Sequence, residues 1–148
     1  MNKAKARVRA DRPRPRILGM PFDNIALQQA VGEIRARLDA GQSTRALFVN
    51  AHCANIAVTD TAYRDLIETA DMVFADGSGM RIAGGLLGVP VRDNVNGTDL
   101  FPLLLAALGD GAHSIFLVGA LPGVAERVLD WMAREHPGVK VAGVRDGY

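Results

Sequence analysis

The chain has 148 residues, 49% of them hydrophobic, and a formal net charge of +1 at pH 7. This length suits one globular domain with a single hydrophobic core. Cys53 is the only cysteine, which excludes an intrachain disulfide and a thiolate-rich metal site. The longest apolar stretches, such as residues 101–108, are much shorter than the ~20 residues that a membrane-spanning helix needs.

Basic residues are concentrated at the N-terminus. Residues 1–16 contain seven lysines and arginines against one aspartate, a net charge near +6, which leaves the remainder near −5. No apolar segment follows this start, so we expect no secretory signal and place the protein in the cytoplasm. We interpret residues 1–16 as a disordered, solvated tail. The alternative is attraction to an anionic membrane surface. The lack of interleaved aromatic residues argues against nucleic acid as the partner.

Expected strands and helices alternate after the tail. Residues 17–22 are a short extended segment, and Asp23 or Asn24 is expected to cap the helix that follows, which Gly41 ends. The remaining elements, in chain order, are a strand over 46–49, a helix over 54–70, a strand over 72–75, a helix over 78–87, a helix ending near 108, a strand over 113–119, a helix after 122–123 and a strand over 140–144. This order predicts an α/β fold over residues 17–148, a Rossmann-like parallel sheet with helices on both faces.

Two local features refine the expected helices. Gly84 and Gly85 interrupt the helix over 78–87, which predicts close packing of backbone on backbone. Thr98 or Asp99 is expected to cap the helix that ends near residue 108, because a hydroxyl or carboxylate there can accept a hydrogen bond from the first turn.

Polar or glycine-rich turns follow three of the expected strands, over residues 50–55, 76–79 and 119–123. The carboxyl ends of parallel strands line the ligand crevice of such sheets, so we expect the three turns to converge. Asp76, held by glycines at the end of a rigid strand, is the candidate for proton transfer. The turn over 119–123 suits a diphosphate, although its glycine spacing matches neither the dinucleotide nor the Walker motif.

Five spaced motifs resemble one family, the WecG/TagA/CpsF glycosyltransferases, also called glycosyltransferase family 26. The motifs are Val49-Asn50-Ala51, Ala75-Asp76-Gly77-Ser78-Gly79, Asn96-Gly97-Thr98-Asp99-Leu100, Phe116-Leu117-Val118-Gly119 with Pro122-Gly123-Val124-Ala125-Glu126, and His136-Pro137-Gly138 followed by Asp146-Gly147-Tyr148. The resemblance runs from about residue 17 to residue 148 and is to members of the exopolysaccharide type.

The resemblance implies inverting transfer of a sugar in cell-surface polysaccharide biosynthesis, at the cytoplasmic face of the membrane. The donor is a UDP-sugar of the N-acetylmannosamine or glucose type, and the acceptor is a polyprenyl-diphosphate-linked saccharide. By this similarity Asp76 is the general base and Asn50 lies in the donor pocket. The further substrate-binding residues that we expect are His52, Gly77, Gly79, Asn96, Gly97, Asp99, Gly119 and Gly123.

No Asp-x-Asp pair occurs in the chain, so we expect neither a metal nor another cofactor. Helix N-termini and basic side chains such as Arg81 or Arg92 would then stabilise the leaving diphosphate. Family members continue beyond the Gly-Tyr pair that ends this sequence, so the domain over 17–148 is expected to be incomplete at its C-terminus. Phe48 and Asn94 stand where many members have Thr and Arg.

Several alternatives stay open. Asp76 could form only an Asx turn, and Asp99 only a helix cap. Trp131 and Met132 belong either to the core or to a contact in a homo-oligomer. The chain as a whole could be a catalytically inactive module that binds a nucleotide sugar or a partner. An NAD(P)-linked oxidoreductase is a third class, and the absence of a glycine fingerprint argues against it.

Overall fold

The computed structural model describes residues 13–148, which form two compact units that meet at Leu100 and Phe101. The first unit contains β1 (Arg16–Ile17), β2 (Met20–Pro21), α1 (Leu27–Asp39), β3 (Ala46–Val49), α2 (Ala51–Thr59), α3 (Thr61–Glu68), β4 (Met72–Ala75) and α4 (Ser78–Leu86). The helix α5 (Gly97–Ala107) crosses the boundary, and the second unit adds β5 (Ser114–Val118), α6 (Val124–Glu135) and β6 (Lys140–Arg145). The predicted domain over 17–148 spans both units.

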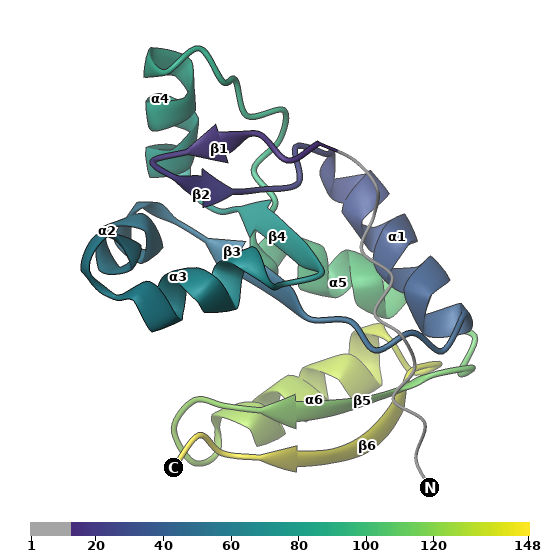
Figure 1. Ribbon diagram of the computed structural model, residues 1–148. Helices are drawn as coiled ribbons and strands as arrows, with labels where there is room; N and C mark the ends of the chain where they lie inside the picture. Colours follow the sequence, from purple (N-terminus) through teal and green to yellow (C-terminus); the bar gives the residue numbers. More distant parts are fainter. Residues whose placement is uncertain (1–12) are drawn as a thin grey trace, which may run out of the picture. The chain divides into compact units, whose positions relative to one another are not determined.

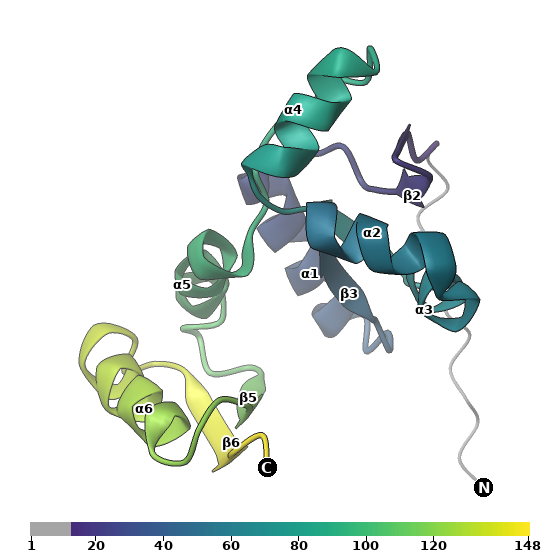
Figure 2. The ribbon, with the colours of Figure 1, turned by 90° about the vertical axis from the view of Figure 1, so that its left-hand side faces the viewer.

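The centre of the first unit is the parallel pair β3 and β4. Its register pairs Ala46 with Met72 and Val49 with Ala75. Every residue of β4 is buried, as expected for a strand that is covered on both faces. Figures 1 and 2 show α1 on one side of the pair and α2 with α3 on the other. The predicted α/β class, with parallel strands and helices on both sides, is therefore confirmed.

The expected extended segment over 17–22 is a hairpin of β1 and β2. Its turn is Leu18-Gly19, and both residues have positive φ, 51° and 80°. Positive φ at both central residues is the geometry of the tightest hairpin turns, in which a leucine is unusual. Of these two residues Gly19 is typical of such a turn, whereas Leu18 gives no signal for it.

The helix expected over 54–70 is wrong in its boundaries, because the structure has two helices that meet at Asp60. The Asp60 side chain accepts a hydrogen bond from the Tyr63 amide at 2.8 Å and so caps α3. Its extended backbone ends α2 at the same residue. A capping aspartate with non-helical backbone is sufficient to divide one apolar pattern into two helices.

The caps expected for α1 are also wrong. Helix α1 begins after Ala26, and the Leu27 amide donates to the Asp93 carboxylate at 2.9 Å. Asp23 instead lies in the core, where its carboxylate accepts from the Val73 amide at 2.7 Å. The Asn24 side chain holds the segment that returns from α4, accepting from the Arg92 amide at 2.7 Å.

A buried ion pair ties the start of the described chain to β4. The Arg14 guanidinium contacts both carboxylate oxygens of Asp23, at 3.0 and 2.9 Å, and donates to the carbonyls of Ala70 and Asp71. Arg16 lies in β1 and pairs at the surface with Glu68. These two arginines of the predicted tail thus belong to the folded unit, and residues 1–12 of that tail lie outside the described residues.

In the second unit β5 and β6 also pair in parallel, with an irregularity in register between Ile115 and Phe116. Helix α6 packs through Met132, which is buried. Its Trp131 ring lies 6.3 Å from Phe101 and 5.1 Å from His136, measured between ring centroids. Trp131 is therefore part of an aromatic cluster within this unit.

The Arg14 pair generates a prediction about stability. The variant Asp23→Asn leaves a buried guanidinium without its counter-charge, so we expect the free energy of unfolding to fall by about 3–5 kcal/mol. The matched control is Glu68→Gln, which removes the exposed partner of Arg16 and should cost about 0–1 kcal/mol. Chemical denaturation of both variants measures the difference, and equal losses would contradict a structural role for the buried pair.

Candidate functional site

The ends of β3 and β4 bring two of the three predicted turns together. Because Val49 is the register partner of Ala75, Asn50 and Asp76 leave adjacent strands at the same edge. The Asp76 amide donates to the Val49 carbonyl at 2.9 Å, which extends the pairing by one residue. The edge on which Asp76 lies is therefore set by backbone hydrogen bonds.

The chain turns from β4 into α4 through Gly77. This residue has φ of 92°, a conformation that glycine adopts freely, and its amide donates to the Asn94 side chain at 2.6 Å. Val95, the residue after Asn94, donates its amide hydrogen to the Ala75 carbonyl at 3.2 Å. Asn94 thus holds the turn that carries Asp76, a role that sequence analysis did not assign to it.

The Asp76 side chain is half-buried. Within residues 13–148 its carboxylate takes part in no hydrogen bond or ion pair, so the Asx turn considered for it does not form. Helix α4 begins directly after it at Ser78, with no side-chain cap on its first amides. A carboxylate without protein partners, beside a helix start with open donors, can accept a proton from a bound hydroxyl.

Asn50 and His52 lie at the start of α2, and both are exposed. The side-chain oxygen of Asn50, Oδ1, caps the helix by accepting from the Cys53 amide at 3.0 Å. Because that bond uses only the oxygen, the Asn50 NH2 group remains available to a ligand. His52 is in the first turn of the same helix.

Gly79 allows the first turns of α2 and α4 to touch. A methyl group on Gly79 would stand 2.9 Å from the Ala51 side chain, closer than real side-chain carbons approach. Two helix N-termini therefore lie side by side at the edge that carries Asp76. Their unpaired amides and helix dipoles favour a negatively charged group.

The Asn96 motif caps α5. The side-chain oxygen of Asn96, Oδ1, accepts from the Asp99 amide at 2.8 Å, and the NH2 group of the same side chain donates to the Asp99 carboxylate at 2.6 Å. The expectation that Thr98 or Asp99 is the cap is therefore wrong, since both lie inside the helix. A methyl group added to Gly97 would stand 3.9 Å from the Phe48 ring, which is an ordinary packing distance.

Gly119 and Gly123 lie in the second unit, at the end of β5 and the start of α6. The Gly119 amide donates to the Arg145 carbonyl at 3.0 Å. Gly123 has φ of 83° and precedes α6, and its carbonyl accepts from the Arg127 guanidinium at 2.9 Å. Helix α6 therefore begins after Gly123, as expected, whereas the binding of a diphosphate by this turn and its convergence with the other two turns stay predictions.

The phenol of Tyr63, in the described part of the first unit, has a raised pKa. A hydrogen bond with the Cys53 side chain raises the pKa of Tyr63 above its ordinary value of 10.0, and burial and the negative charge of the Cys53 thiolate act in the same direction. Tyr63 lies in α3 and Cys53 in α2, so the interaction couples these two helices.

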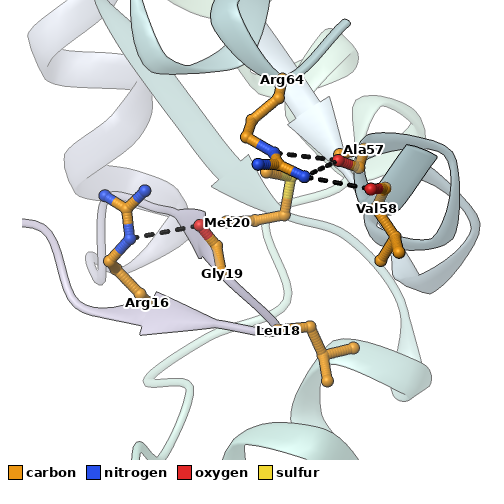
Figure 3. Close-up of a pocket in the computed structure, with 7 residues that line it drawn as sticks. All are labelled: Arg16, Leu18, Gly19, Met20, Ala57, Val58 and Arg64. Atoms are coloured by element: carbon orange, nitrogen blue, oxygen red, sulfur yellow. Dashed lines mark hydrogen bonds between the residues drawn. The ribbon is translucent and has the colours of Figure 1, made fainter. Parts of the chain in front are cut away.

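A hollow of about 360 Å³ lies between the β1–β2 turn and the end of α2. Figure 3 shows the residues that line it. The two arginines that line it already donate hydrogen bonds to backbone carbonyls. Arg64 donates to the carbonyls of Ala57 and Val58, at 2.6 to 3.2 Å, and Arg16 to the Gly19 carbonyl at 3.2 Å. We therefore regard this hollow as the capped end of α2 and not as a binding site.

The described part of the chain contains no group of three or more histidine, cysteine or acidic residues arranged to hold a metal ion. Nor do residues 13–148 include a helix with the length and apolar character needed to cross a membrane.

Residues 15–148 match the model of the Glycosyl transferase WecG/TagA/CpsF family. The chain belongs to this family. It is similar to proteins of Staphylococcus aureus, at 33% identity over 129 residues, and of Bacillus spizizenii, at 28% over 111 residues. Both are described as N-acetylglucosaminyldiphosphoundecaprenol N-acetyl-beta-D-mannosaminyltransferases. The alignments cover 85% and 75% of this chain but 50% and 43% of those proteins, so it spans about half the length of these curated relatives.

The contact at Gly79 predicts a stability change. In Gly79→Ala the added methyl group must separate α2 from α4, and we expect a loss of about 1–3 kcal/mol in the free energy of unfolding. Gly32→Ala is the matched control, because Gly32 is an exposed helical glycine with open space around it. That change should stabilise by about 0.4–1 kcal/mol. If both variants unfold alike in denaturant, the two helix starts are not in contact.

Tyr63 predicts a pH dependence. Its raised pKa favours the neutral phenol in the folded state, so its contribution to stability is complete below pH 10 and lost as the pH rises through the folded-state pKa. The chain has two tyrosines, so phenolate absorbance in a Tyr148→Phe background follows Tyr63 alone. We expect Cys53→Ala to lower the observed pKa. An unchanged titration would show that Cys53 does not act on Tyr63.

Proposed function

We propose that this chain is a glycosyltransferase domain that transfers a sugar from a UDP-sugar to a polyprenyl-diphosphate-linked saccharide, with inversion at the anomeric carbon. The observation that carries the proposal is the Asp76 carboxylate, which has no partner within residues 13–148 and lies at the strand edge beside the starts of α2 and α4. The names of the relatives, which contain a diphosphoundecaprenol acceptor, support the acceptor class. The proposed donor sugar is of the N-acetylmannosamine or glucose type.

In the proposed reaction Asp76 is the general base. Its carboxylate accepts the proton of an acceptor hydroxyl as that oxygen attacks the anomeric carbon. The bond between the anomeric carbon and the β-phosphate oxygen breaks, and its electron pair leaves with UDP. Attack from the face opposite the leaving group inverts the configuration. A positioned base of this kind supplies about 10²- to 10⁴-fold of the rate.

The leaving diphosphate gains negative charge, which hydrogen-bond donors at the site can stabilise. The first amides of α2 and α4 are close to one another, and those of α4 have no side-chain cap. Preorganised backbone amides of this kind stabilise a developing charge without reorganising. Asn50, with its free NH2 group, and His52 are the side chains that we propose for donor contacts at the same edge.

Substrates of this kind imply work at a membrane surface, because a polyprenyl chain is held in the bilayer, and the face that we propose is the cytoplasmic one. We propose that the protein is peripheral there. The basic residues at positions 3–12 would attract an anionic leaflet at about 1 kcal/mol each.

The variant Asp76→Asn tests the proposal. It keeps the size of the side chain but removes the base, so we expect transfer to fall by about 10²- to 10⁴-fold while UDP affinity stays within a few-fold. The control Asp65→Asn removes an exposed carboxylate from α3 of the same unit and should leave transfer unchanged.

Transfer is measured with a radiolabelled UDP-sugar and a lipid-linked acceptor, and UDP affinity by calorimetry. Equal turnover by Asp76→Asn and the parent chain would remove Asp76 from the mechanism. Binding of UDP without transfer by the parent chain would favour the alternative, a nucleotide-sugar-binding module without activity.

A further inference from the structure

The face of α4 that begins at the candidate site is open and apolar. Ser78, Arg81, Ile82 and Gly85 follow one another at helical spacing, and with Pro90 and Val91 they line a groove of about 450 Å³. The segment from Gly77 to Val91 contains one charged residue, Arg81, and no acidic residue. Ile82 is 63% exposed, and Leu86 and Leu87, the last residue of the helix and the residue after it, are 84% and 55% exposed.

One wall of the groove is the chain segment that follows α4, which packs closely against the helix. A methyl group on Gly84 would stand 2.5 Å from the Val89 carbonyl, and the Val89 amide donates to the Gly84 carbonyl at 2.8 Å. The returning chain is therefore fastened directly against the helix backbone. Gly85, the next residue, has no atom within 4 Å of the position of an added methyl group, so the space above it is open.

From these observations we infer that the α4 groove binds the isoprenoid chain and diphosphate of the lipid-linked acceptor. The inference rests on the proposed function and names the residues that would hold this part of the acceptor. Such a molecule has a hydroxyl-bearing sugar, then a diphosphate, then an apolar chain. The protein presents the matching groups in the same order, with Asp76 before α4, Arg81 one turn into it, and Ile82, Gly85 and Leu86 beyond.

The dimensions and charges agree with this order. A rise of about 1.5 Å per residue places Leu86 about 12 Å along the helix from Ser78, which suits a diphosphate followed by the first isoprene units. Within residues 13–148 the Arg81 guanidinium makes no hydrogen bond or ion pair, so its charge is available to a phosphate. Exposed apolar side chains that continue a groove are typical of a surface that binds an apolar ligand.

The test uses farnesyl diphosphate as a soluble isoprenoid diphosphate, titrated into the full chain by calorimetry. We expect Gly85→Leu, which fills the groove with a good helix former, to lower its affinity at least tenfold. Ile82→Asp, a change at an exposed position, should do the same. The matched control is Gly32→Leu, at another exposed helical glycine with open space, and should leave the affinity unchanged.

Titration with inorganic pyrophosphate tests the binding of the diphosphate group separately from that of the isoprenoid chain. We expect pyrophosphate to bind at least tenfold more weakly than farnesyl diphosphate, to be insensitive to Gly85→Leu, and to be weakened by Arg81→Gln. Wild-type affinity of both groove variants for farnesyl diphosphate would overturn the inference. So would an Ile82→Asp variant that loses binding to anionic vesicles but not to farnesyl diphosphate, because the face would then dock on a bilayer.

A parallel titration with UDP keeps the two proposals apart. If UDP binds and Asp76 proves essential for transfer while the groove variants are unaffected, the proposed function stands and the inference is wrong. If UDP does not bind but the groove variants still weaken farnesyl diphosphate, the donor assignment is wrong and the groove remains a site for an isoprenoid diphosphate.

Discussion

The parallel pairing of β3 with β4 is the constraint on which the candidate site depends. Its register places Val49 opposite Ala75, and the hydrogen bond from the Asp76 amide to the Val49 carbonyl carries the pairing past the end of the strand. A shift of one residue would turn every side chain of β4 to the other face and move Asp76 away from Asn50. The burial of all four β4 residues makes such a shift costly.

Around this pair, contacts between distant segments shape the edge. The Arg14–Asp23 pair fastens the entering chain to β4, and Asn94 holds Gly77 in its turn. Gly79 lets α2 and α4 begin in contact. The result is a carboxylate without a partner among residues 13–148, next to two helix starts with open amides, a combination that suits the proton transfer and the leaving diphosphate that we propose. The α4 groove, where we propose that an apolar ligand binds, lies along the helix that starts at this edge.

The sequence was a good guide where local signals decide the structure. The strands over 46–49 and 72–75 were predicted to the residue, because each is a continuous apolar run that ends at a polar turn. The close packing expected at Gly84 and Gly85 was confirmed at Gly84 by its contact with Val89 and was wrong at Gly85, which has open space around it. The predictions were wrong where a side chain bonds to a residue that is distant in the sequence and not to the local backbone. Asp23 has the chemistry of a helix cap, but a buried arginine nine residues earlier draws it into the core.

The candidate site divides in the same way. Asp76 and Asn50 were found from their places after strands, and the structure brings these two exits together. Asn94 was noted only as a departure from the family pattern, since nothing local signals that it accepts a hydrogen bond from an amide 17 residues earlier. The hairpin turn at Leu18 was missed because leucine carries no signal for positive φ.

The most direct test of the account is amide NMR of the full chain during titration with UDP. We expect the signals of Ala51, His52 and Gly77 to Met80 to shift together with one dissociation constant, because the diphosphate would lie on the first turns of α2 and α4. The signals of the β1–β2 turn should stay unchanged. Shifts confined to that turn, or no shift at either helix start at saturating UDP, would contradict the claim that this strand edge receives the sugar nucleotide.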